Sequence, residues 1–439
     1  MARPSRSSMR WTIVAMAFLG TTINYIDRAN LGVALPDLKR EFGLSPEMSG
    51  LILGAFFWTY AAFQLPSGWF VDKVGPRIAY TVAVVWWSIF TSATAIARGF
   101  TSMFGFRLLL GIGEAPAYPT NAKSVAEWFP KQERAFATSI YDSGARAGTV
   151  AALPLCTWII KQWGWRASFV ITGIIGVVWS LVWYSIYRHP SKHTMISDAE
   201  RDYIAAGQVA TSPAQKGPQS GRVPWSSLFK YRAIWGMMLG FFCLNFVIYF
   251  FVTWFPTYLR DGRGFSDVKT GFYGMAPGIF AILAGWLGGR TSDFLVRRGL
   301  SLTKARKIPI VGGMLVASSI GLAVVVPSAT AAVALLALSY GGLCFAAASI
   351  WSLPADIAPT PQHVASIGGI QNFASNTAGI CITYLVGKLL AQTGGFVVPL
   401  IMAGGFAILG ALSYLFIVPE VKPLEARGEL APQREAEVA

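Results

Sequence analysis

Long apolar stretches recur along the chain and alternate with short polar connections. They predict helices over residues 11–32, 48–70, 78–97, 101–125, 135–160, 166–187, 233–255, 270–293, 308–327, 331–355, 364–390 and 396–418. A stretch of about 20 residues crosses a hydrocarbon core of about 30 Å as a helix. The pattern therefore predicts an all-α integral membrane protein with twelve transmembrane helices. Composition agrees, because 54% of the 439 residues are hydrophobic and only 13% are charged.

A polar segment in the middle of the chain divides the twelve spans into six and six. Residues 188–232 contain a Ser/Pro/Gln/Gly-rich stretch at 211–223, a composition that is typical of a linker. We therefore expect an N-terminal six-helix bundle at 1–187, a cytoplasmic linker at 188–232, a C-terminal six-helix bundle at 233–419 and a cytoplasmic tail at 420–439.

The formal net charge of +15 comes from basic residues that gather in alternate connections. These bases are Arg3, Arg6, Arg10, Lys73, Arg77, Lys131, Arg134, Arg297, Arg298, Lys304, Arg306 and Lys307. Because cytoplasmic loops of membrane proteins are enriched in Lys and Arg, both termini are expected in the cytoplasm. The expected location is a bacterial-type inner membrane. The bases form no stripe with interleaved aromatics on a soluble domain, so a nucleic-acid partner is not expected.

Few residues could support a metal site or an enzyme. The four cysteines, Cys156, Cys243, Cys344 and Cys381, lie in apolar stretches without CxxC spacing and are expected to be packing residues. The three histidines lie in or at loops, and no GxSxG motif occurs. The sequence therefore disfavours a membrane enzyme, a bound cofactor and a metal site, and it offers no specific support for a passive channel.

One short motif occurs in both halves. Its copies are Gly68-Trp-Phe-Val-Asp72-Lys73-Val-Gly75-Pro-Arg77 after the second span and Gly289-Arg-Thr-Ser-Asp293 after the eighth. The glycine permits close helix approach, and the aspartate can pair with bases of a neighbouring cytoplasmic loop, which would latch one conformation. This motif resembles the hallmark loop of the major facilitator superfamily. The resemblance implies a monomer of two bundles, a substrate site between them near the bilayer midplane, and rocking-type alternating access.

Ionisable residues inside the spans concentrate in the first half. Asp27 and Arg28 lie in span one, while Arg107 and Glu114 lie about two turns apart on one face of span four. Because intramembrane charges usually pair or face a cavity, we expect two exchangeable ion pairs, Asp27 with Arg107 and Glu114 with Arg28. An arginine that moves onto a substrate carboxylate would couple binding to proton uptake by the acids. Static structural salt bridges are the alternative.

Longer strings resemble a narrower group, the anion:cation symporters, which include bacterial galactonate and glucarate transporters. The strings are Thr22-Ile-Asn24-Tyr25-Ile-Asp27-Arg28, Tyr60 with Gln64-Leu-Pro66-Ser-Gly68, and Arg107-Leu-Leu-Leu-Gly111-Ile-Gly-Glu114. The resemblance implies that Arg28 contacts the substrate carboxylate, that Asp27 and Glu114 carry protons, and that Tyr25, Tyr60 and Arg107 line or support the site. In the second half it matches Asn245, Tyr249, Trp351, Gln371, Asn372, Phe373 and Asn376, for which helix packing is the alternative.

The chain departs from galactonate-like relatives in span five, where Asp142-Ser143-Gly144-Ala145-Arg146 places alanine at a position that is usually glutamine. Asp142 and Arg146 stand four apart and can form a structural pair on one helix face. Alternatively, Arg146 grips the second carboxylate of a dicarboxylic sugar acid. The sequence thus predicts proton-coupled import of a sugar acid, an aldarate, aldonate or hexuronate. The alternative substrate is an aromatic or other organic carboxylate.

Overall fold

The structure is a computed structural model that describes residues 8–208, 225–255, 258–265 and 267–424. Helices and turns account for the regular structure in these ranges, and no strand occurs in them. Arg3, Arg6, the stretch at 211–223 and most of the predicted tail lie outside the described residues.

The first half contains six long or medium helices. They are α1 (Met9–Phe42), α2 (Pro46–Val74), α3 (Pro76–Ala93), α4 (Phe100–Glu114), α5 (Ala117–Trp128) and α6 (Arg134–Ile186), with a short turn η1 (Thr94–Ile96) after α3. Span four is broken at Ala115 and Pro116 into α4 and α5, because a proline has no N–H for the helical ladder. Spans five and six run together as α6, and they meet at Gly164, whose positive φ of 82° lets the chain double back.

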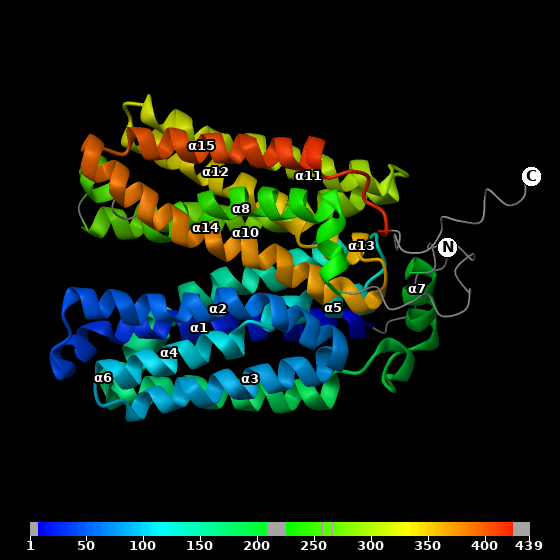
Figure 1. The fold of residues 1–439 in the computed structure, drawn as a ribbon, viewed down its shortest axis with the longest axis horizontal. Coiled ribbons are helices and arrows are strands. Elements are labelled where there is room, and N and C mark those ends of the chain that lie inside the picture. Colours follow the sequence, from blue (N-terminus) through cyan, green and yellow to red (C-terminus); the bar gives the residue numbers. More distant parts are fainter. Residues whose placement is uncertain (1–7, 209–224, 256–257, 266, 425–439) are drawn as a thin grey trace, which may run out of the picture.

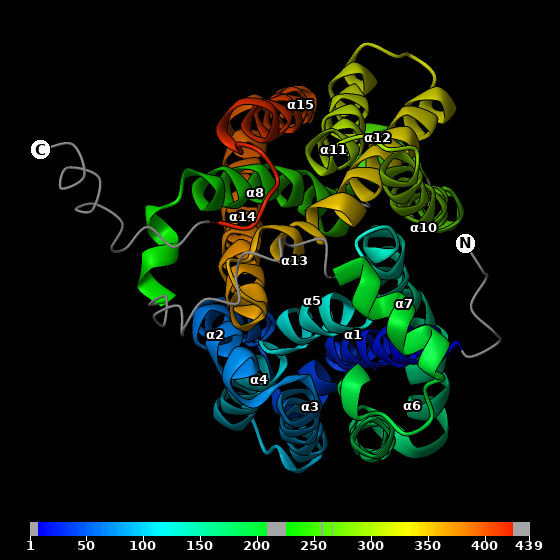
Figure 2. The same cartoon turned by 90° about the vertical axis from the view of Figure 1, so that its right-hand side faces the viewer.

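The second half repeats this organisation. Its helices are α8 (Arg232–Thr253), α10 (Asp267–Arg297), α11 (Leu302–Ala317), α12 (Ala329–Ile350), α13 (Leu353–Ile357), α14 (Val364–Thr393) and α15 (Val397–Leu412). Shorter 3-10 or π segments are η5 (Tyr258–Gly262), η6 (Ser318–Val324), η7 (Pro361–His363) and η8 (Ser413–Ile417). Figure 1 shows α1–α6 and α8–α15 as two groups of roughly parallel helices that lie side by side, and Figure 2 shows the same two groups end-on.

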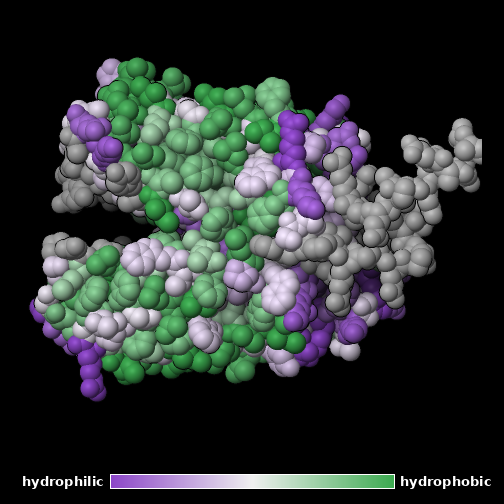
Figure 3. Space-filling view, in the orientation of Figure 1, coloured by the Kyte–Doolittle hydropathy of each residue, from purple (hydrophilic) through white to green (hydrophobic). Residues whose placement is uncertain are grey.

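The outer surface is suited to lipid. Large apolar side chains point outward from both groups, among them Trp158, Leu181, Ile279 and Phe416, and hydrophobic side chains cover much of the visible face while hydrophilic ones gather toward its ends (Figure 3). Eight helices in the described ranges are long and apolar enough to cross a membrane. Spans one, two and four and most of span five fall outside that set, and spans one, four and five are those predicted to carry charged residues.

The described parts of the segment between the halves, residues 188–208 and 225–232, contain helical structure that the sequence did not predict. It contains η2 (Pro190–Lys192), the helix α7 (Asp198–Gln208) and η4 (Trp225–Lys230). Glu200 of α7 is fully buried, accepts the backbone N–H groups of Met9 and Arg10 at 3.1 and 3.2 Å, and forms an ion pair with the Arg10 side chain at 2.8 Å. A carboxylate suits the free N–H groups at the start of α1. The linker is thereby anchored to the first half, and we name the end of the molecule where α7 lies the linker end.

Candidate functional site

Arg28 on α1 is the central positive charge of the site. Its Nε donates to Oε2 of the unexposed Glu114 at 2.6 Å. The guanidinium carbon lies 4.8, 4.7 and 4.4 Å from the ring centres of Tyr25, Phe56 and Tyr60, distances at which cation–π attraction is expected. Nη2 has no hydrogen-bond partner. Arg28 is therefore a fixed guanidinium with a free donor, which is what a carboxylate ligand requires.

Only one of the two predicted ion pairs forms. Arg28 and Glu114 pair as predicted, whereas the predicted pair of Asp27 with Arg107 is wrong, since no ion pair joins these two described residues. The Asp27 carboxylate and the Arg107 guanidinium are near enough for their charges to attract, but they do not come within ion-pair distance. Arg107 instead packs over Phe56 at 5.2 Å.

Asp27 is the least satisfied acid of the site. It is 1% exposed, and neither carboxylate oxygen has a hydrogen-bond partner. An ionised carboxylate without a partner is costly in such surroundings, while a protonated one is not. This burial suits a group that takes up and releases a proton.

Polar and aromatic groups of the second half face the same region. The Asn372 amide donates to the Tyr60 hydroxyl at 3.4 Å, and Trp351 stacks on Tyr118 of α5 with ring centres 4.8 Å apart. Both contacts join residues of the two halves, so they lie at the interface between them. Tyr118 was missed by the sequence analysis, although it directly follows the Glu114-Ala-Pro-Ala string.

Other predicted residues of the second half make contacts within that half. The Tyr249 hydroxyl donates to Oδ1 of Asn376 at 3.2 Å. The Asn245 amide donates to the Phe241 carbonyl of its own helix at 3.1 Å, and the Gln371 amide donates to the Ile350 carbonyl at 3.4 Å. Such bonds are typical of packing between and along membrane helices.

The predicted pair of Asp142 and Arg146 on α6 is present. Arg146 Nη1 donates to Asp142 Oδ2 at 2.9 Å, and the Tyr118 hydroxyl donates to Oδ1 of Asp142 at 3.4 Å. Arg146 Nη2 lies 2.9 Å from Sγ of Cys344 on α12, and Nε has no partner. Cys344 is therefore a polar contact between the halves as well as the packing residue that was predicted.

Asp72 of the repeated motif bonds to the start of a helix in the other half. Its carboxylate accepts the backbone N–H groups of Ala365 and Ser366 at 3.2 and 2.7 Å, and Lys123 of α5 lies 3.0 Å away. A Cβ atom at Gly68 would lie 2.6 Å from the Ala365 carbonyl oxygen. The missing side chain of Gly68 thus lets α2 approach α14, and Asp72 supplies negative charge to the N-terminus of α14.

The second copy of the motif does the same in the opposite direction. Asp293 accepts the backbone N–H groups of Ala135 and Phe136 at 3.2 and 2.8 Å. A Cβ atom at Gly289 would lie 2.6 Å from the Ala135 carbonyl oxygen. Each aspartate therefore caps the first turn of a helix in the other half.

The predicted pairing of these aspartates with bases of a neighbouring cytoplasmic loop is present for Asp293, which pairs with Arg306 at 3.0 Å, whereas Asp72 pairs with Lys123 of α5. Lys73 lies over the Trp69 ring at 4.8 Å, and Arg77 donates to the Tyr184 carbonyl at 2.9 Å. Gly75, with φ of 81°, ends α2. Lys73 and Arg77 point along the outer surface. The aspartates point to the interface between the halves, where they meet helix N-termini and buried cations.

Asp356 of α13 joins the halves through two arginines. Arg134 Nη1 lies 3.0 Å from one carboxylate oxygen and Arg306 Nε lies 2.8 Å from the other. Arg306 also pairs with Asp293 at 3.0 Å, and its side chain has no exposure. The sequence pattern indicates both arginines only as loop charges, and the one signal for Asp356 is an acid near the end of an apolar span.

These contacts close the interface at the linker end. At the opposite end, the space-filling surface is hollowed between the two halves (Figure 3).

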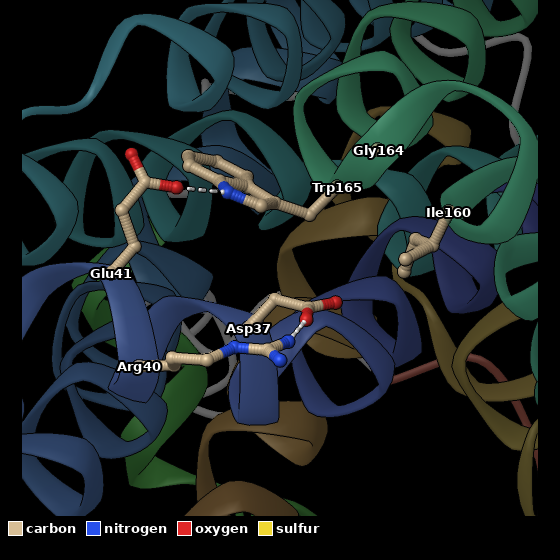
Figure 4. Close-up of a pocket in the computed structure, with 6 residues that line it drawn as sticks. All are labelled: Asp37, Arg40, Glu41, Ile160, Gly164 and Trp165. Atoms are coloured by element: carbon tan, nitrogen blue, oxygen red, sulfur yellow. Dashed lines mark hydrogen bonds and ion pairs between the residues drawn. The ribbon is translucent and has the colours of Figure 1, made fainter.

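A separate pocket lies at the open end of the first half and does not belong to this site. Asp37, Arg40, Glu41 and Trp165 line it (Figure 4). Glu41 accepts from Trp165 Nε1 at 2.7 Å, and Asp37 pairs with Arg40. These α1 residues lie nine or more positions beyond Arg28, roughly 14 Å along the helix.

The fold and the site together define a class, a polytopic membrane transporter with a polar site between two helical bundles. The family model described as Major Facilitator Superfamily matches residues 17–384. The chain belongs to the major facilitator superfamily. The predicted fold is confirmed, and so are the predictions of a multi-pass membrane transporter and of a protein that is not an enzyme.

Named relatives cover nearly the whole chain. It is 38% identical over 426 residues to the "D-galactonate transporter" of Escherichia coli O6:H1, which covers 96% of this chain and 98% of the relative. It is 35% identical over 428 residues to the "Probable galactarate/D-glucarate transporter GarP" of Escherichia coli K12, with 95% and 96% covered. It is 32% identical over 424 residues to the "Hexuronate transporter" of Bacillus subtilis, with 95% and 97% covered.

A solved structure has the same fold. The structure of the proton:xylose symporter XylE bound to 6-bromo-6-deoxy-D-glucose superposes with a TM-score of 0.73 at 18% sequence identity, covering 94% of this chain and 97% of that one.

The two motif copies at the linker end give a first prediction. Gly68→Leu is expected to push α2 away from the Ala365 carbonyl and to open the linker end. Spin labels at Lys73 and Lys304, in a variant without the native cysteines, should then lie several ångströms farther apart by pulsed EPR. Gly54→Leu on the same helix is the matched control, because a Cβ atom there meets nothing within 4 Å. An unchanged distance distribution in Gly68→Leu would contradict this role of the glycine.

Proposed function

We propose that the protein is a proton-coupled symporter that imports a sugar acid by alternating access. The observation that carries the proposal is Arg28, which has a free Nη2 and lies over the Tyr60 ring, whose hydroxyl accepts from Asn372 of the other half. Relatives that are named for galactonate, galactarate/glucarate and hexuronate support the substrate class, since all are sugar acids. A structural neighbour named as a proton symporter accords with the coupling ion.

The polar groups around Arg28 suit a hydroxylated carbon chain. Hydroxyls that leave water need hydrogen-bond partners, and the Tyr60 hydroxyl and the Asn372 amide supply them from the two halves. The rings of Tyr25, Tyr118 and Trp351 can cover the carbon skeleton. The same rings would also suit an aromatic carboxylate, which is the second candidate substrate.

Coupling follows from competition for Arg28. A substrate carboxylate takes Arg28 as its partner and weakens the 2.6 Å contact with Glu114. Glu114 would then be a fully buried charge without a cation, and taking up a proton removes that cost. Asp27, buried without a hydrogen-bond partner, is the second acid that carries a proton.

The direction of transport follows from the charge distribution. The basic connections lie at the linker end with α7, and loops of this kind remain in the cytoplasm. The hollow at the other end then faces the outside, so substrate enters with protons from the more acidic side. The carrier works in a bacterial-type inner membrane, as a monomer, without a cofactor other than the coupling proton.

Uptake into proteoliposomes tests the proposal. Labelled galactarate is expected to accumulate when the outside is more acidic than the inside. After an uncoupler is added, it should equilibrate across the membrane without accumulating. Asp27→Asn is expected to lose accumulation but to keep exchange of internal for external substrate. Equal uptake rates with and without the pH gradient would overturn proton coupling. Competition by phthalate but not by sugar acids would favour the aromatic candidate.

A further inference from the structure

A second arginine of the site, like Arg28, is paired with an acid and keeps a free donor. Arg146 pairs with Asp142 of its own half, as Arg28 pairs with Glu114. Each of the two guanidinium groups has one nitrogen without a partner. Their side chains are 15% and 14% exposed, so both reach the interface without lying on the surface.

The packing of α1 against α6 places Arg146 closer to the linker end than Arg28. Gly144 lies against Phe18 and Thr21, while Gly148 lies against Thr22 and Tyr25. The two helices therefore run in the same direction, and position 146 is level with residues 20–23 of α1. At about 1.5 Å per residue, this level is roughly 10 Å closer to the linker end than that of Arg28.

Aromatic side chains connect the two charges. Tyr25, which lies under the Arg28 guanidinium, also interacts with Tyr118 and Asp142. Tyr118 donates to Asp142 and stacks on Trp351. A carbon chain between the two arginines would thus lie along ring faces and phenol hydroxyls, which suits a polyhydroxylated chain.

The present partner of Arg146 in the second half is a weak one. Its Nη2 contacts Sγ of Cys344, and a neutral thiol is a poor hydrogen-bond acceptor. A carboxylate is a much stronger acceptor and can take two guanidinium donors at once. An arginine with a free Nε and a thiol contact therefore gains from a second carboxylate at this place.

We propose that Arg146 binds the second carboxylate of a six-carbon dicarboxylic sugar acid whose first carboxylate is held by Arg28. The inference rests on the proposed function and narrows it to aldarates. The extended chain of such an acid, with a charge-assisted hydrogen bond of about 2.8 Å at each end, is long enough to span the offset of roughly 10 Å between the two arginines. Because Cys344 belongs to the second half, this carboxylate also lies where the two halves meet.

Isothermal titration of the purified full-length protein with galactarate and galactonate tests the inference, because the two acids differ only at the second carboxyl group. We expect wild type to bind galactarate about ten- to a hundredfold more tightly than galactonate, the range for a hydrogen bond to a charged group. The double variant Asp142→Asn/Arg146→Gln should lose this preference and bind both acids with the galactonate affinity. Arg146→Lys, which keeps the charge but not the fork, should retain part of it.

The matched control is Asp37→Asn/Arg40→Gln, an exposed pair on α1 that should keep the full preference. Thermal unfolding without ligand shows whether each variant is folded. Equal affinities for the two acids in wild type, or a full preference that survives in Asp142→Asn/Arg146→Gln, would overturn the inference and leave the proposed function standing. A wild type that binds neither acid would overturn the proposed function and this inference with it.

Discussion

Arg28→Ala is expected to lower sugar-acid affinity by at least about a hundredfold and to abolish proton-driven uptake. Removing one partner of a desolvated, hydrogen-bonded charge pair typically costs several kcal/mol, which corresponds to such a factor. The effect is large because the substitution has two consequences. It removes the donor for the substrate carboxylate, and it leaves the unexposed Glu114 without its cation at 2.6 Å.

Two further variants separate these consequences. Arg28→Lys retains a positive charge near Glu114 but cannot present two parallel donors, so it should restore thermal stability and not affinity. Arg98→Ala, a substitution at an exposed position, should leave binding and uptake as in wild type. Isothermal titration and uptake into proteoliposomes give the two readouts. Sugar-acid binding by Arg28→Ala at wild-type affinity would mean that another group holds the carboxylate.

The helices were predictable because lipid demands long apolar stretches that leave a clear signal. The breaks within these helices were less predictable. Pro116 and Gly164 both stand inside apolar runs, and the sequence alone does not say whether a membrane helix bends, ends or doubles back at such a residue. The helix α7 escaped prediction for the opposite reason, since its polar surface resembles a linker, although Glu200 and Tyr203 both fix it to Arg10 of α1.

The site residues of the first half were predictable because charge inside a membrane span is rare. Asp142 with Arg146 follows from their spacing on one helix, and Arg28 with Glu114 follows because both are charges inside apolar spans. Partners across the interface do not follow in this way. Asp356 meets Arg134 over a separation of 222 residues, and no local pattern reports which arginine an acid will meet at such a distance.

The repeated motif has the same structural role in both halves. The sequence shows that the motif recurs but not what its aspartates bind. Asp72 and Asp293 each accept two N–H groups at the start of a helix from the opposite half. In the proposed alternating-access cycle, the two caps would break together when the halves separate at the linker end. Two equivalent latches therefore hold one conformation, and the substrate must supply the contacts that compensate for their loss.

Asp356→Ala is expected to destabilise the protein by about 3–5 kcal/mol, the cost of leaving buried charge without its partner. Arg134 and Arg306 donate to Asp356 at 3.0 and 2.8 Å, and the side chains of Arg306 and Asp356 have no exposure. Without the carboxylate, two guanidinium groups of like charge would face each other at the interface. The conformation that is closed at the linker end would therefore lose the most stability. Thermal unfolding should show a clearly lower midpoint.

The same labels at Lys73 and Lys304 should report a shift toward longer distances in Asp356→Ala, because separating the halves lets water reach Arg134 and Arg306. Asp37→Ala is the matched control, since its partner Arg40 is 79% exposed and such surface pairs contribute only about 0–1 kcal/mol. If the two alanine variants unfold at the same temperature, the Asp356 cluster does not hold the halves together, and closure of the linker end rests on Asp72 and Asp293 alone.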